Sequence, residues 1–130
     1  MSEPVLEFID VRKSFGPGRP ALDGLTLEVG AAETVALVGP SGCGKTTALR
    51  LANRLLDADS GEVRVFGEPV SRQEPVALRR RIGYVIQEGG LFPHWTVERN
   101  VETVPRLLEW DPERRRARGR ELLEMVGLPH

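Results

Sequence analysis

Two kinds of hydrophobic pattern follow one another along the chain. Segments 5–11 and 22–29 are rich in alternating apolar and polar side chains, which predicts β-strands. Residues 34–38 form a continuous apolar run, a pattern typical of a strand that is buried on both faces in a parallel sheet. Two further short strands are predicted at 62–66 and 82–87.

Helical spacing of apolar residues begins after residue 44. Thr96 can cap one of the later helices, although Pro105 lies inside its pattern. Asp111 followed by Pro112 marks the start of the last helix, and Gly127 marks its end. The predicted helices span 44–56, 75–81, 97–108 and 111–126.

Composition narrows the class of protein. The chain has 130 residues, which suits one domain, and its 40% hydrophobic share can form a core. With 18 Lys and Arg against 19 Asp and Glu, the net charge of −1 gives no long-range attraction to nucleic acid. A single cysteine excludes an internal disulfide, and no apolar run approaches the roughly 20 residues of a membrane span. We therefore expect a soluble, cytoplasmic chain without a signal peptide.

The segment 39–46, Gly-Pro-Ser-Gly-Cys-Gly-Lys-Thr, fits the pattern G-x-x-x-x-G-K-[ST] of a P-loop. It lies between a predicted strand and a predicted helix, as that motif requires. Glycines at 39, 42 and 44 would permit backbone angles closed to other residues, so that several N–H groups can face one anion. Lys45 would add an ammonium against the β- and γ-phosphates, and the Thr46 hydroxyl could ligate Mg²⁺. The motif predicts binding of a nucleoside triphosphate.

Residues on both sides of the P-loop point to a family. Phe15 ends the first strand in Lys-Ser-Phe-Gly, and Gln87 ends the run Ile-Gly-Tyr-Val-Ile-Gln. The stretch Leu-Phe-Pro-His-Trp-Thr-Val (91–97) follows. Together they resemble the ATP-binding subunits of ABC transporters. The resemblance implies that Phe15 stacks on adenine and that Gln87, in a Q-loop at about 84–93, contacts Mg²⁺ and the attacking water. Ordinary packing remains open for Phe15, as does a polar strand end for Gln87.

Four stretches, 53–55, 80–87, 90–94 and 104–110, resemble importers of osmoprotectants of the glycine betaine, choline and proline type. This resemblance implies an α/β P-loop NTPase fold of the ABC ATPase type. Residues 1–130 would be the N-terminal portion of one nucleotide-binding domain, with an antiparallel strand subdomain and the start of a helical subdomain at about 97–130. His94 would face the membrane subunit rather than act in catalysis.

The resemblance also implies a set of ligands and partners. The family's signature, Walker B aspartate, catalytic glutamate and switch histidine do not occur in 1–130, so we expect a truncated chain that binds MgATP without hydrolysing it. Its partners would be a membrane permease and a second nucleotide-binding subunit, on the inner face of the cell membrane. Gln87 and Lys45 are the predicted catalytic residues, and Thr46 and Gln87 the Mg²⁺ ligands. The predicted nucleotide-binding residues are Phe15, Gly39, Pro40, Ser41, Gly42, Cys43, Gly44, Lys45, Thr46 and Thr47, within a P-loop at 39–47.

Other functions are compatible with parts of the pattern. The segment 88–101 could dock a membrane permease without any role for nucleotide. A small-molecule kinase ranks last, because it would need a substrate site after the second half of the sheet. The arginine run at 114–118 is best explained as the solvated face of a helix. Cys43 can be a reactive thiol beside Lys45 or an inert spacer.

Overall fold

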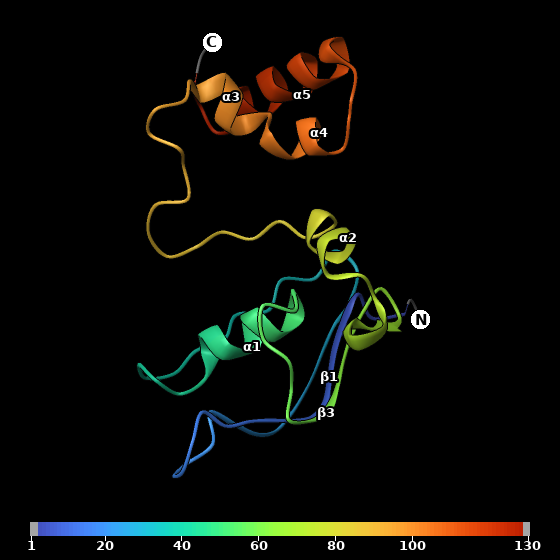
Figure 1. Cartoon of the computed structure of the whole chain (residues 1–130), viewed down its shortest axis with the longest axis vertical. Coiled ribbons are helices and arrows are strands. Elements are labelled where there is room, and N and C mark those ends of the chain that lie inside the picture. Colours follow the sequence, from blue (N-terminus) through green and yellow to red (C-terminus); the bar gives the residue numbers. More distant parts are fainter. Residues whose placement is uncertain (1–2, 129–130) are drawn as a thin grey trace. The chain divides into compact units, whose positions relative to one another are not determined.

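The structure is a computed structural model, and it describes residues 3–128. Contacts divide the chain into two compact units (Figure 1). The N-terminal unit ends at Ile82 and the C-terminal unit begins at Gly83.

An antiparallel sheet with the strand order β2-β1-β3-β4 forms one layer of the N-terminal unit. Leu6 of the central strand lies opposite Val29 on one side and Val65 on the other. The register shifts between Phe8 and Val11, where the central strand bulges. This sheet confirms the predicted antiparallel strand subdomain. The strands are β1 (Leu6–Lys13), β2 (Leu22–Val29), β3 (Ser60–Val65) and β4 (Glu68–Pro69).

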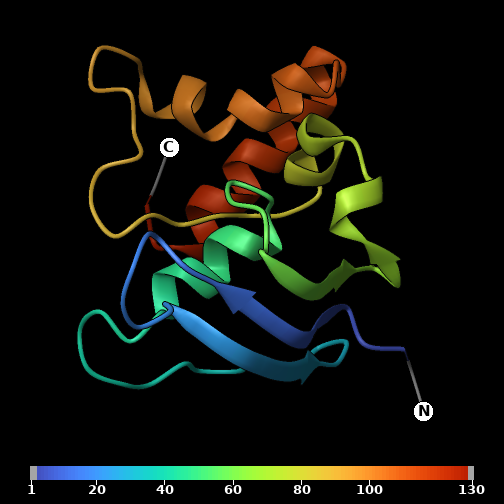
Figure 2. The same cartoon turned by 60° about the horizontal axis from the view of Figure 1, so that its bottom comes forward.

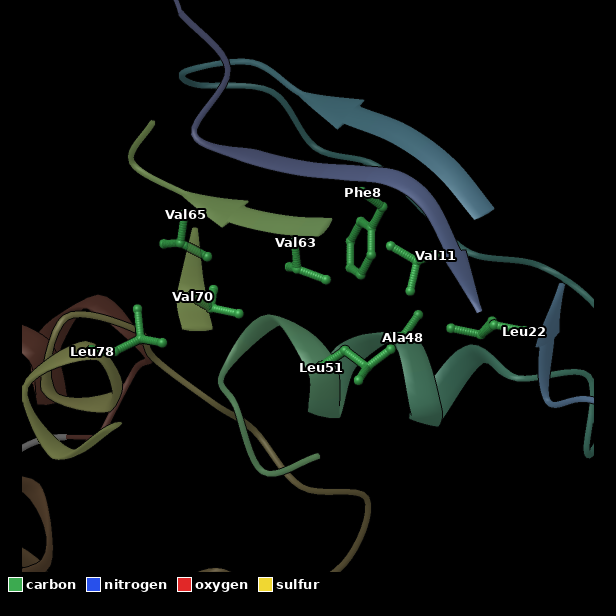
Figure 3. Close-up of a cluster of buried hydrophobic side chains, with 9 residues drawn as sticks. All are labelled: Phe8, Val11, Leu22, Ala48, Leu51, Val63, Val65, Val70 and Leu78. Carbon is green, nitrogen blue, oxygen red and sulfur yellow. The ribbon is translucent and has the colours of Figure 1, made fainter. Parts of the chain in front are cut away.

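Helix α1 (Lys45–Ala52) covers one face of this sheet, as Figure 2 shows. Figure 3 shows side chains of the strands pointing toward Ala48 and Leu51 of the helix. Leu51 is only 1% exposed, so the helix owes its position to burial of this apolar stripe. The buried hydrophobic cluster comprises Phe8, Val11, Leu22, Ala48, Leu51, Val63, Val65, Val70 and Leu78.

The predicted helix at 44–56 ends earlier than expected, at Ala52. Arg54 has a φ of 56°, which breaks the helical path. The side chain of Arg79 replaces the lost helical bonds by donating to the carbonyls of Asn53, at 3.1 Å, and Arg54, at 2.6 Å. Arg79 belongs to α2 (Pro75–Arg80), which follows the short 3₁₀ helix η1 (Val70–Arg72).

The C-terminal unit contains α3 (Val97–Val101), α4 (Thr103–Leu107) and α5 (Pro112–Met125). The prediction of one helix at 97–108 was therefore wrong. Pro105 cannot donate a hydrogen bond, and its ring crowds the carbonyl of the residue four positions earlier, so the helix breaks at Glu102.

Glu102 stands at that break and is 1% exposed. One of its carboxylate oxygens accepts hydrogen bonds from Arg106, at 3.1 Å, and from Arg115 of α5, at 2.7 Å. The break therefore places a buried charge where it ties α4 to α5. Asp111 caps α5 by accepting from the Arg114 N–H, as the Asp-Pro signal predicts.

Two predicted strands are absent. Residues 34–38 and 82–87 are irregular, and Val38 and Val85 are 93% and 94% exposed. Apolar runs indicate a tendency to be buried, but a strand also needs neighbours that pair with its backbone. No residue within 3–128 forms a ladder with either segment. Among the described residues, no helix has both the length and the apolar character that crossing a membrane requires.

Candidate nucleotide-binding site

The P-loop connects the irregular segment 34–38 to the first turn of α1. Gly42 and Gly44 have φ angles of +79° and +101°, which L residues rarely adopt, as predicted. The same prediction was wrong for Gly39, which does not have a positive φ. A Cβ at Gly39 would lie 2.7 Å from the Cys43 sulfur, so a larger residue would require the Cys43 side chain to move. The loop thus folds back on itself between 39 and 43.

Lys45, the first residue of α1, holds the loop closed from inside. Its Nζ donates to the carbonyl of Gly39 at 2.6 Å and to that of Pro40 at 2.8 Å, and it lies 3.5 Å from the Cys43 sulfur. An ammonium has three N–H donors, and these contacts keep its positive charge beside the backbone of residues 39–43. The hydrogen bonds to carbonyls are of a kind that an entering anionic oxygen can replace.

The loop also abuts a segment that lies more than 20 residues earlier. A Cβ on Gly44 would lie 2.3 Å from the Ala21 carbonyl oxygen, so only glycine permits this approach. Ala21 also lines a cleft of about 760 Å³ between residues 15–25 and 40–43. Phe15 and the P-loop therefore line the same cleft. Its lining residues are Phe15, Gly16, Pro17, Arg19, Pro20, Ala21, Leu22, Asp23, Gly24, Leu25, Pro40, Ser41, Gly42 and Cys43.

Phe15 is 63% exposed and takes no part in the buried cluster. The Nζ of Lys13 lies 5.5 Å from the centroid of its ring. Core packing therefore does not account for this aromatic residue. Its ring is available at the edge of the cleft, where a flat ligand could stack on it.

The other predicted site residues lie outside the lining of this cleft. Thr46 and Thr47 follow Lys45 in the first turn of α1, and Thr46 is exposed. Gln87 is exposed in the C-terminal unit, so its contact with the P-loop remains a prediction. No group of three or more His, Cys, Asp and Glu side chains within 3–128 could hold a metal ion. The two predicted Mg²⁺ ligands are of other types, a hydroxyl and an amide.

His94 lies in an aromatic cluster. Its ring makes edge contacts with Phe92 and Trp95, at centroid distances of 6.2 and 5.7 Å, and Arg99 stacks on Trp95. Asn100 fixes the turn that carries them, because its side chain accepts from the Phe92 N–H at 2.7 Å and donates to the Phe92 carbonyl. The segment 88–101 is therefore locally ordered without a regular strand.

Sequence reasoning missed Asp59. Its carboxylate accepts a hydrogen bond from the Ser14 N–H at 2.7 Å and lies 3.3 Å from the Lys13 Nζ. The Ser14 N–H is the main cause that holds the pKa of Asp59 below its ordinary value, and Lys13 adds to the effect. The only signal in the sequence was indirect, since Lys13 is one of just two lysines.

Comparison with known proteins agrees with this geometry. A family model described as ABC transporter matches residues 22–130. The chain is 44% identical over 124 residues to the glycine betaine/carnitine/choline transport ATP-binding protein OpuCA of Bacillus subtilis, covering 95% of the chain and 33% of that protein. It is 49% identical over 113 residues to the osmoprotectant import ATP-binding protein OsmV of Salmonella typhimurium, covering 85% of the chain and 30% of that protein. The chain thus spans about a third of the length of these curated relatives.

Solved structures lead to the same fold. A dimeric ATP-binding cassette in a post-hydrolysis state, bound to ADP and Pi, superposes with a TM-score of 0.80 at 29% identity, covering 96% of the chain and 58% of that structure. A bacterial Atm1-family ABC exporter with ATP bound gives a TM-score of 0.70 at 35% identity, covering 78% and 18%. The predicted fold class and family resemblance are both confirmed. The chain belongs to the ABC transporter family and carries part of its ATPase fold.

Proposed function

We propose that the chain binds MgATP as the nucleotide-binding portion of an ABC importer ATPase that powers uptake of osmoprotectants, in particular quaternary amines. The observation that carries this proposal is the cleft that Phe15 shares with the P-loop. It offers an aromatic face for a base, and its P-loop wall includes Cys43, whose sulfur lies 3.5 Å from the Lys45 ammonium that would meet phosphates. The names of the relatives, which refer to glycine betaine, carnitine, choline and osmoprotectants, support the substrate class.

The residues of the loop suit a triphosphate. The space beyond the Cα of Gly42 is open, with no atom within 4 Å of where a Cβ would lie. The first turn of α1 adds unpaired backbone N–H groups and the positive end of the helix dipole. Lys45 can exchange its carbonyl acceptors for phosphate oxygens, a contact worth up to about 4 kcal/mol at an effective dielectric near 20.

Oxygen donors also suit the metal. The hydroxyl of Thr46 and the amide oxygen of Gln87 would hold Mg²⁺, a cation that prefers oxygen ligands. Bound Mg²⁺ would neutralise charge on the β- and γ-phosphates. Gln87 would in addition orient the attacking water, as the family resemblance implies. We expect no turnover by residues 1–130 alone, because no apolar run after α1 ends in Asp-Glu to supply a catalytic carboxylate.

In the assembled transporter the proposed partners are a membrane permease and a second nucleotide-binding subunit. One of the structural neighbours is a dimeric ATP-binding cassette, which supports the second partner. The proposed location is cytoplasmic, peripheral on the inner face of the cell membrane. No nucleic acid partner is proposed, given the net charge of −1.

Titration calorimetry with MgATP tests the nucleotide proposal. Lys45→Ala should weaken binding at least about tenfold, because a charge-assisted contact worth more than about 1.4 kcal/mol is removed. Arg50→Ala is the matched control, since it removes an exposed cation from the last turn of the same helix. Equal affinities of wild type and Lys45→Ala would refute the assignment of the P-loop.

A second candidate function is docking of a permease through 88–101 without use of nucleotide. The ordered turn around Asn100 favours it, because Leu91 and Phe92 beside that turn are 75% and 44% exposed. Absence of MgATP binding together with retained binding to the permease would favour this candidate. Binding of both would favour the importer ATPase.

A further inference from the structure

Asp59 connects the start of β3 to the segment that carries Phe15. Its own N–H donates to the Arg12 carbonyl at 2.9 Å. Its carboxylate accepts from the Ser14 N–H at 2.7 Å and lies 3.3 Å from the Lys13 ammonium. One residue therefore contacts three consecutive residues that lie more than 40 positions earlier. The Asp59 side chain is half exposed, so the contacts are not a product of core packing.

The backbone that carries Asp59 is itself held closely. Ser60 pairs with Arg12 in the ladder between β3 and β1. Gly61 has a φ of +79°, and a Cβ there would lie 2.2 Å from the Asp10 carbonyl oxygen. This approach of two backbones requires glycine and sets the distance between the strands. Asp59 thus projects from a fixed junction toward Ser14.

Core packing does not hold Phe15 in place. Its ring is 63% exposed, and the turn after it contains Gly16 and Gly18, both with positive φ and both with open space where a Cβ would lie. The ring contacts the Lys13 ammonium, 5.5 Å from its centroid, and Lys13 is in turn paired with Asp59. Asp59 therefore restrains Phe15 by two routes, through the Ser14 backbone and through the Lys13 charge.

We infer that Asp59 is a positioning residue for base recognition: it holds Ser14 and Lys13 so that the Phe15 ring stays at the mouth of the cleft. This inference rests on the proposed function, in which Phe15 is the platform for adenine. Asp59 is not among the residues that line the cleft. Its removal should affect affinity for ligands that carry a base and should spare binding of a bare phosphate chain.

Calorimetry with two ligands, MgATP and magnesium tripolyphosphate, separates these effects. Asp59→Ala should weaken MgATP binding by about fivefold or more, the lower end of what base–aromatic stacking contributes. Its affinity for tripolyphosphate should equal that of wild type. Asp57→Ala is the control, because the Asp57 side chain is 77% exposed and pairs with the neighbouring Arg54 rather than with the segment that carries Phe15. It should leave both affinities unchanged.

Two further variants test whether Asp59 acts through Phe15. Asp59→Asn keeps an acceptor for the Ser14 N–H and should recover most of the MgATP affinity. The double variant Phe15→Ala/Asp59→Ala should bind MgATP as tightly as Phe15→Ala alone, because the platform is already absent. If Asp59→Ala does not fold, Asp59→Asn serves in its place: it should show a smaller loss of MgATP affinity, with its affinity for tripolyphosphate unchanged.

The possible outcomes separate this inference from the proposed function. Equal weakening of both ligands by Asp59→Ala, or additive losses in the double variant, would overturn the positioning role. The same holds if Lys45→Ala weakens MgATP binding and Asp59→Ala does not, although the proposed function would then stand. Wild type that binds neither ligand would overturn the proposed function and this inference with it.

Discussion

Substitution of Gly44 by alanine should damage the fold more than the same substitution at Gly42. Both residues have positive φ, so each alanine costs about 1–2 kcal/mol for a left-handed backbone. At Gly42 nothing lies within 4 Å of the new Cβ, whereas at Gly44 it would lie 2.3 Å from the Ala21 carbonyl oxygen. Relief of such a contact with backbone costs about another 1–3 kcal/mol. The expected losses are therefore about 2–5 kcal/mol for Gly44→Ala and about 1–2 kcal/mol for Gly42→Ala.

Equilibrium unfolding in urea, followed by far-ultraviolet circular dichroism, measures both losses. The midpoint for Gly44→Ala should fall below that of Gly42→Ala, with similar slopes for the two variants. Equal midpoints would show that the Ala21 backbone moves away from the new Cβ without cost in stability. A changed slope would instead indicate altered compactness, and the free energies could not then be compared directly.

Two other predictions concern stability. Leu51→Ala should lower the free energy of unfolding by about 2–5 kcal/mol, because it leaves a cavity at a side chain that is 1% exposed. Leu49→Ala, on the same helix at a position that is 50% exposed, should lower it by less than about 1 kcal/mol. Similar urea midpoints for the two variants would contradict this account of the core. Hydrogen bonds from the backbone N–H groups of Ala77 and Val76 lower the pKa of Glu74, as the Ser14 N–H does for Asp59. The stability that these two carboxylates contribute is therefore fully present above the ordinary carboxyl pKa and is lost as the pH falls through their lowered pKa values. As the pH is lowered from 6, the urea midpoint of the double variant Asp59→Asn/Glu74→Gln should fall less than that of wild type. Parallel profiles of midpoint against pH would contradict a role of these two carboxylates in acid stability.

The elements that depend on local patterns were predicted well. Alternation located β1 and β2, and the Asp-Pro start with the Gly127 stop located α5. The runs at 34–38 and 82–87 were misassigned as strands, because their pattern reports a need for burial while strand formation depends on pairing with other segments. The break at Glu102 was not predicted, because the helical spacing of apolar residues continues across it.

The features of the candidate site divide in the same way, into those that a local motif predicts and those that depend on contacts between distant segments. The spacing of the P-loop motif predicted the two left-handed glycines, Gly42 and Gly44, because a loop of eight residues carries its own geometry. The motif was wrong about the backbone of Gly39, which has no positive φ and lies close to the side chain of Cys43. The contacts of Ala21 with Gly44 and of Asp59 with Ser14 join segments 23 or more residues apart. Such contacts follow from the sheet and its register, which a single sequence does not reveal.

The distribution of lysines has a consequence for chemical labelling. Of the 18 Lys and Arg residues, only Lys13 and Lys45 are lysines. Lys13 lies beside the Phe15 ring, and Lys45 contacts backbone carbonyls of the P-loop. The Lys13 ammonium pairs with the Asp59 carboxylate, and the Lys45 ammonium donates to two backbone carbonyls. Among side chains, amine-specific acylation can therefore modify only these two positions. A reagent that surveys amines over the whole surface of other proteins would, on this one, report on two positions, each in contact with a residue that lines the cleft, Phe15 or Cys43.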